Sequence, residues 1–136
     1  MGILYAAYGS NMNLRQMAHR CPNAKRIGVG VINNYELVFA RNGYAHITGK
    51  KGSSVPVVLW ELTAVCEEAL DHYEGYPIFY KKQLVKVKTK KEILEAMVYV
   101  MAEPYCDVRM RPSYSYLERI KEGYRDNLIN QDIIIE

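Results

Sequence analysis

The sequence predicts an α+β fold that is mostly β, a small closed or partly closed β-barrel with a few helices packed on its outside. Short runs of strand length recur along the chain, and Gly, Asn and Pro turn signals separate them. Helical periodicity is confined to three segments. With 136 residues the chain fits one domain, residues 1–136, with a single core.

The first predicted strand, residues 3–7, runs straight into the polar turn Gly9-Ser10-Asn11. Gly9 allows the backbone to approach a ligand closely or to take a positive φ. Ser10 and Asn11 can cap the helical segment over residues 13–20, or they can bind an anion, because free N–H groups at such a turn point outward. Spacing alone favours the cap.

The strands that follow are predicted from alternation and from β-branched runs. Residues 25–39 are expected to form two strands joined by a tight turn at Asn33-Asn34, and residues 49–54 a flexible exposed loop. Pro56 is expected at the edge or the beginning of its strand, because proline has no N–H for the ladder. The remaining expected strands are residues 45–48, 55–62, 80–88 and 93–101.

Two further helices are predicted from residues that typically mark the ends of helices. Thr63 is a predicted N-cap for a helix over residues 64–73, and Gly75 is its predicted C′ stop. Ser115 and Glu118 form a capping box for the last helix, whose apolar stripe is predicted to include Leu117, Ile120, Tyr124 and Leu128.

Composition narrows the classes of protein. The hydrophobic fraction of 49% and the charged fraction of 24% are those of an ordinary soluble globular protein. No apolar run reaches the length of a membrane span, and the N-terminus lacks the parts of a signal peptide, so a cytoplasmic location is the default. Three cysteines without CxxC spacing and three histidines without HxxxH spacing predict neither a disulfide framework nor a metal.

Glu74 is the strongest candidate for acid–base chemistry. It lies at the predicted C-terminal end of a helix, where the macrodipole raises the pKa of a carboxyl group. Burial among Tyr73, Tyr76 and Phe79 would raise that pKa further, toward a value that suits proton transfer near neutral pH. On the pattern alone, a solvated glutamate in the last turn of a surface helix is the favoured interpretation.

Three separated motifs together resemble the gamma-glutamylcyclotransferase-like family. They are Tyr8-Gly9-Ser10-Asn11, Leu70-Asp71-His72-Tyr73-Glu74-Gly75 and Pro112-Ser113-Tyr114-Ser115-Tyr116, and their order and rough spacing agree across nearly the whole chain. The resemblance implies a barrel of six or seven strands with the active site at its mouth.

The resemblance also implies a cofactor-independent reaction. The α-amine of a small γ-glutamyl substrate attacks its own γ-carbonyl and releases 5-oxoproline and an amine, with Glu74 as general base and acid. The backbone of Gly9, Ser10 and Asn11 would hold the α-carboxylate or the oxyanion. The resemblance further implies that Tyr8 helps to bind the substrate and that Tyr80 and Tyr116 form hydrogen bonds in the pocket.

Several alternatives stay open at this stage. The enzyme could instead deprotect one particular biosynthetic γ-glutamyl intermediate, or the barrel could be a noncatalytic binder of small ligands. A cysteine hydrolase would need Cys66 or Cys106 with His72 as base. The lysine-rich residues 81–91, or a platform of tyrosines, could bind RNA, although the net charge of +3 does not require nucleic acid.

The partner predicted is therefore a small γ-glutamyl molecule, without nucleic acid or a membrane. The apolar run Ile133-Ile134-Ile135 could be disordered, or it could be a swapped or edge strand in a homodimer, so the oligomeric state is left open.

Overall fold

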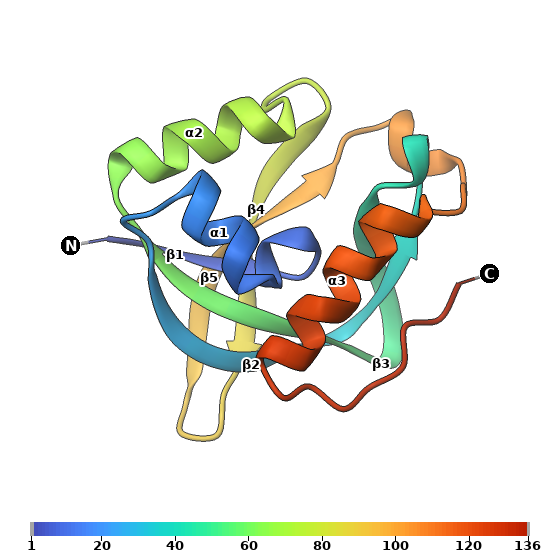
Figure 1. Ribbon diagram of the computed structural model, residues 1–136. Coiled ribbons are helices and arrows are strands. Elements are labelled where there is room, and N and C mark those ends of the chain that lie inside the picture. The colour runs from blue at the N-terminus through green and yellow to red at the C-terminus, as the bar shows by residue number, and fades with distance from the viewer. Residues whose placement is uncertain (1, 136) are drawn as a thin grey trace.

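The chain forms a closed β-barrel with helices on its outside, shown in Figure 1 as a computed structural model that describes residues 2–135. Five strands close the barrel in the order β1-β3-β2-β4-β5. β1 is antiparallel to β3 and parallel to β5, which joins the two ends of the sheet. The strands are β1 (Ile3–Ala7), β2 (Lys25–Phe39), β3 (Ala45–Leu62), β4 (Tyr80–Lys88) and β5 (Ile93–Met101). The predicted fold class is confirmed.

The predicted count of six or seven strands is wrong, because β2 and β3 each replace two shorter expected strands. β2 continues through the expected turn, where Asn34 has a φ of 66° and forms a bulge. β3 includes the expected loop, and residues 50–53 bulge out between its pairs Asn33↔Ser54 and Tyr35↔Gly49 with β2. A bulge absorbs the turn-forming residues without ending the strand.

Pro56 lies inside β3, paired with Val31, so it is not at the beginning of its strand but at a local edge of the sheet, the other place predicted for it. β1 ends opposite Val58, and at Pro56 β3 has a strand neighbour on one side alone. A residue without an N–H is tolerated there.

The helices mostly begin and end where their local signals predict. They are α1 (Leu14–Arg20), α2 (Ala64–Glu74) and α3 (Tyr114–Asp126), with short 3-10 turns η1 (Ser10–Met12), η2 (Arg41–Gly43) and η3 (Tyr105–Asp107). Thr63 Oγ1 accepts a hydrogen bond from the Cys66 amide at 3.1 Å, and Gly75 ends α2 with a φ of 66°. None of the described helices is long and apolar enough to cross a membrane.

The start of α3 differs from its prediction. Its cap is Ser113, whose Oγ accepts from the Tyr116 amide at 3.2 Å, instead of Ser115. Ile120 and Tyr124 are buried as predicted, whereas Leu128 lies beyond the helix and is 92% exposed. The helix therefore begins two residues earlier than predicted, and Tyr116 is its third residue instead of its first.

Helix α3 packs directly against the first turn of the chain. A Cβ added at Gly123 would lie 2.9 Å from the Asn13 amide nitrogen, so only glycine permits this approach. Asn127 Nδ2 donates to the carbonyl of Met12 at 2.8 Å, and its Oδ1 accepts from Arg26 Nε at 2.8 Å. These contacts join the C-terminal helix to η1.

The C-terminal tail follows α3 back along the barrel (Figure 1) and forms neither helix nor strand up to residue 135. Ile133 and Ile135 are partly buried against the core, and Ile134 is exposed. The run is therefore not an edge strand within this chain, and its role in a homodimer stays a prediction.

Within the barrel, β2 and β4 pair only at Val31↔Lys88, and this short contact is the seam between them. A Cβ at Gly30 would lie 2.5 Å from Val87 Cγ1 and 2.9 Å from the Lys88 carbonyl oxygen. We expect Gly30→Ala to lower the free energy of unfolding by about 1–3 kcal/mol, because the seam must open to admit the methyl group. Urea denaturation measures the change.

Gly28→Ala is the matched control on the same strand, since no atom lies within 4 Å of a Cβ at that position. Equal losses of stability in the two variants would contradict the close approach at the seam.

Candidate active site

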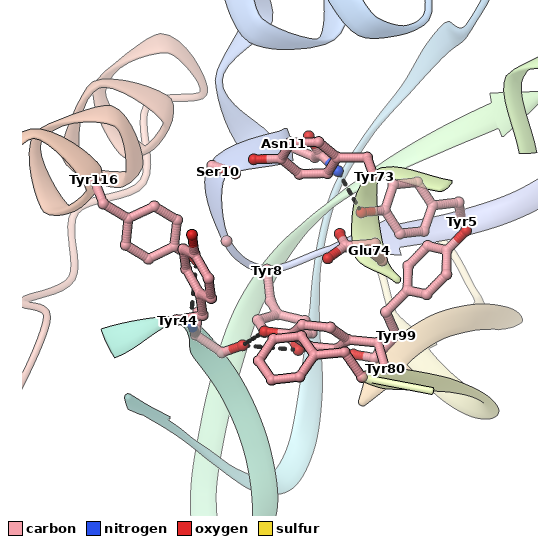
Figure 2. Close-up of a pocket in the computed structure, with 13 residues that line it drawn as sticks. Tyr5, Tyr8, Ser10, Asn11, Tyr44, Tyr73, Glu74, Tyr80, Tyr99 and Tyr116 are labelled. Carbon is pink, nitrogen blue, oxygen red and sulfur yellow. Dashed lines mark hydrogen bonds between the residues drawn. The ribbon is translucent and has the colours of Figure 1, made fainter. Parts of the chain in front are cut away.

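A cavity of about 130 Å³ lies between the first turn, the end of α2 and the inner wall of the barrel (Figure 2). Its volume is several times the roughly 30 Å³ that one water molecule occupies, so it can admit a small organic group. All seven residues predicted for the site line it. The lining consists of Tyr5, Tyr8, Gly9, Ser10, Asn11, Tyr44, Ala45, Tyr73, Glu74, Phe79, Tyr80, Tyr99 and Tyr116.

Glu74 is the last residue of α2, and the left-handed Gly75 turns the chain sharply away from it. The Phe79 amide then bonds back to the Gly75 carbonyl at 2.8 Å and leads into β4. Figure 2 shows the Glu74 carboxylate among the rings of Tyr5, Tyr8 and Tyr73. Burial raises the pKa of this carboxyl group from 4.5 to about 7, against the opposing charge of Arg20.

Glu74 is the only charged side chain among the described residues that line the cavity. The tyrosines around it remain neutral, since burial raises the pKa of each phenol well above its usual value of 10. These phenols belong to Tyr5, Tyr8, Tyr80, Tyr99 and Tyr116. The site therefore combines one carboxyl group that titrates near neutral pH with several neutral hydroxyl groups.

The backbone of Ala45 fixes three of these tyrosines. Its carbonyl accepts hydrogen bonds from the hydroxyls of Tyr80 at 2.6 Å and Tyr8 at 3.4 Å. Its amide donates to the Tyr116 hydroxyl at 3.1 Å. Tyr8 also donates to the carbonyl of Tyr99 at 2.7 Å. The hydroxyls are thus held in place before any substrate arrives.

The first turn does not cap α1, so the interpretation favoured by spacing is wrong. Asn13 is the cap, and its Oδ1 accepts from the Gln16 amide at 3.1 Å. Ser10 and Asn11 are free to face the site because the chain makes a 3-10 turn before the helix begins. Asn11 Nδ2 donates to the Tyr5 hydroxyl at 3.0 Å.

Gly9 has a φ of −118°, so the expected alternative of a positive φ is wrong. A Cβ at this position would meet Ala45 Cβ at 3.5 Å and the Tyr116 hydroxyl at 3.6 Å. Glycine therefore leaves the lining open beside Tyr116. Within residues 2–135 the amides of Gly9, Ser10 and Asn11 donate no turn or loop hydrogen bond, whereas those of the next two residues bond back to the turn.

The sequence assigns no site role to five of the lining residues: Tyr5, Tyr44, Tyr73, Phe79 and Tyr99. It predicts Tyr73 and Phe79 only as neighbours that bury Glu74. Tyr73 lies inside the second motif, directly before Glu74, and Tyr5 stands three residues before Tyr8. Tyr44 and Tyr99 belong to segments without any motif. The Tyr44 ring lies 5.3 Å from that of Tyr116, in an edge-to-face arrangement that arises only when η2 meets α3.

A partly buried ion cluster anchors α2 to the barrel. Lys82 Nζ on β4 lies 2.6 Å from Glu67 Oε2 and 2.9 Å from Asp71 Oδ1 on α2. The Tyr99 hydroxyl on β5 donates to the same Asp71 oxygen at 2.6 Å. Asp71 stands three residues before Glu74, so this cluster fixes the turn of α2 that presents the carboxylate.

The geometry does not favour a cysteine hydrolase. Cys66 is buried near the start of α2, while His72 is exposed. Cys106 is paired with the neighbouring Asp107. Across residues 2–135 no hydrogen bond joins a cysteine to a histidine.

Comparisons with known proteins identify the family of this chain. Residues 5–123 match the gamma-glutamyl cyclotransferase, AIG2-like family, so the chain belongs to this family and the predicted resemblance is confirmed. This family includes cyclotransferase enzymes. No curated protein sequence gave a match.

Solved structures share the whole barrel. A gamma-glutamyl cyclotransferase and an uncharacterized protein from Homo sapiens each align with a TM-score of 0.83 and 26% identity, over 93% of this chain and 80% of theirs. YkqA from Bacillus subtilis has the same fold, with a TM-score of 0.78 and 21% identity over 91% of this chain and 48% of that one.

The ion cluster on α2 predicts a local effect. We expect Lys82→Met to speed amide hydrogen exchange in the last turn of α2 about two- to fivefold, because a partly exposed pair contributes less than about 1 kcal/mol. Lys81→Met is the control, as Lys81 is exposed on the same strand. Equal exchange rates in the two variants would refute the anchoring role.

The raised pKa of Glu74 predicts a dependence of stability on pH. Between about pH 4.5 and 7 the folded protein holds a proton that the unfolded chain has released, so this stabilising contribution is full below that range and is lost as the pH rises through about 7. Glu74→Gln removes the titration. We expect the stability of the wild type, relative to this variant, to fall by about 1–3 kcal/mol from about pH 5 to about pH 8.

Denaturant unfolding at several pH values measures this difference. Glu68→Gln, an exposed position on the same helix, is the control and should show no such trend. A difference between wild type and Glu74→Gln that is flat across the range would contradict the raised pKa.

Proposed function

We propose that this protein is a γ-glutamylcyclotransferase that converts a small γ-glutamyl amide or dipeptide into 5-oxoproline and a free amine. The observation that carries the proposal is Glu74, a half-buried carboxyl group with a pKa of about 7 on the wall of a phenol-lined cavity. Membership of the gamma-glutamyl cyclotransferase, AIG2-like family supports the same chemistry.

The reaction begins with a proton transfer from the substrate's α-ammonium group to the Glu74 carboxylate. The freed amine attacks the γ-carbonyl carbon, and its C–N bond closes a five-membered lactam. The amide bond to the leaving group then breaks while Glu74 returns the proton to the departing nitrogen. The α-ammonium loses two protons in all and the leaving nitrogen gains two, so no net proton is released.

The first turn supports binding of the substrate's negative charge. The amides of Gly9, Ser10 and Asn11 stand beside the cavity, and we assign them to the α-carboxylate or to the oxyanion that forms on the γ-carbonyl. Such donors act strongly in a site from which water is excluded. Tyr8 lines the cavity beside these three residues, and we assign it to substrate binding as well.

Tyr80 and Tyr116 complete the proposal as hydrogen-bonding residues. Their hydroxyls are held by the backbone of Ala45 and stay neutral, so they can orient the folded substrate without competing for its proton. Holding the tethered amine near the carbonyl supplies most of what a unimolecular ring closure needs.

The test is release of 5-oxoproline from a panel of γ-glutamyl amino acids and γ-glutamyl amines. We expect Glu74→Gln to lower kcat/KM about 10²- to 10⁴-fold while its circular dichroism spectrum stays that of the wild type. The wild-type kcat/KM should rise with pH through about 7, because the base must first lose its proton. Glu68→Gln should retain full activity.

Each contrary result has a definite meaning. Unchanged turnover by Glu74→Gln would refute the proton-transfer mechanism. Failure of the wild type to release 5-oxoproline from any panel member would refute the general cyclotransferase and favour one biosynthetic intermediate or a noncatalytic binding barrel.

A further inference from the structure

Arg20 contacts two walls of the site from outside the cavity. It is the last residue of α1, and its Nη1 donates to Ser10 Oγ at 3.2 Å and to Asn11 Oδ1. Its Nη2 donates to the hydroxyl of Tyr73, the residue before Glu74. The guanidinium carbon also lies 3.7 Å from the centre of the Tyr73 ring.

One planar cation thus bridges two segments that are far apart in the sequence. Asn11 and Tyr73 are separated by α1, β2 and β3, and no strand pairing joins the first turn to the end of α2. An arginine fork suits this task, because several N–H groups in one plane can bind two oxygen acceptors while the face stacks on a ring.

The charge of Arg20 is not consumed by an ion pair. Among residues 2–135 no carboxylate oxygen lies within 4 Å of its guanidinium nitrogens. Every acceptor that it uses is a neutral oxygen from Ser10, Asn11 or Tyr73. Its positive charge therefore acts on the site at a distance.

We propose that Arg20 is a positioning residue that fixes the Ser10–Asn11 turn against the end of α2 that carries Glu74. This inference rests on the proposed function of that site. The distance between the turn and the Glu74 carboxylate must stay constant. The turn is assigned to the substrate's α-carboxylate or oxyanion, and Glu74 to its α-amine, which is only a few bonds away.

The groups that face Glu74 are one cation and several phenols. They are Arg20 on α1, Tyr5 and Tyr8 on and after β1, Tyr80 on β4, Tyr99 on β5 and Tyr116 on α3. The phenols stay neutral around pH 7, so Arg20 alone supplies charge. Removing that charge should raise the pKa of Glu74 above about 7.

The experiment follows the Glu74 carboxyl signal and the Gly9 to Asn11 amide signals by NMR in the wild type, Arg20→Gln and Arg20→Lys. The Glu74→Gln variant assigns the carboxyl signal. We expect Arg20→Gln to raise the apparent pKa of Glu74 by about half to one unit and to displace the turn amides. Arg20→Lys keeps the positive charge but lacks the planar guanidinium group. In this variant the pKa of Glu74 should return to about its wild-type value, while the turn amides stay displaced.

Arg15→Gln is the matched control, because Arg15 stands on the same helix and pairs with Glu122 instead of the site. It should change neither signal. In turnover with a γ-glutamyl substrate, we expect Arg20→Gln to lower kcat/KM about 10- to 100-fold and to move its rise with pH to higher values, as the carboxyl titration moves.

Unchanged turn amides and an unchanged Glu74 titration in Arg20→Gln would overturn the inference. If Arg20→Gln does not fold, the test rests on Arg20→Lys. Amide signals of Gly9 to Asn11 that stay at their wild-type positions in Arg20→Lys would then also overturn the inference. The NMR readouts do not depend on turnover, so they test Arg20 even if the wild type releases no 5-oxoproline and the proposed function fails.

Discussion

The burial of one carboxyl group, that of Glu74, is the interaction on which the rest of the site depends. A carboxylate loses hydration energy when aromatic rings surround it, and the pKa of about 7 expresses that loss. The contacts of Lys82 with Asp71 and Glu67 hold α2 in place from outside the cavity. These contacts, worth less than about 1 kcal/mol, fix the turn of α2 that presents the carboxylate to the cavity.

The tyrosines of the cavity form a rigid, neutral lining. Their hydroxyls bond to the Ala45 backbone, to the Tyr99 carbonyl and to Asp71, and no buried side-chain nitrogen or oxygen of the described residues lacks a partner. Ring contacts reinforce this order, as the Phe79 ring lies 5.2 Å from those of Tyr80 and Tyr105. A lining fixed in this way needs little reorganisation when charge develops in a reacting substrate.

The architecture explains how a short turn becomes part of a site. The 3-10 turn η1 lies between β1 and α1, and α3 covers it through Gly123 and Asn127. The turn near the N-terminus is therefore held in place by residues near the C-terminus, Gly123 and Asn127. The tail beyond α3 follows the barrel, where Ile133 and Ile135 extend the apolar core.

Much of this could be predicted from the sequence, because it depends on near neighbours in the chain. The caps of α2 at Thr63 and Gly75, and hence the position of Glu74 at its end, follow from signals a few residues apart. The β-rich class follows from alternation along the strands, and the three motifs together indicate the family. Seven of the residues that line the cavity were identified in this way.

The rest was decided by tertiary structure. Asn34 has the conformation of a turn residue, yet it became a bulge because β3 pairs with β2 on both sides of it. Tyr99 joins the site through its carbonyl, which accepts from Tyr8, 91 residues earlier. Tyr44 and Arg20 join it through contacts between the elements outside the barrel, with Tyr116 of α3 and Tyr73 of α2. The sequence by itself determined the local elements and their chemistry, whereas only the tertiary structure decided which distant side chains would meet, since that depends on the simultaneous pairing of all five strands and on the contacts between the elements outside them.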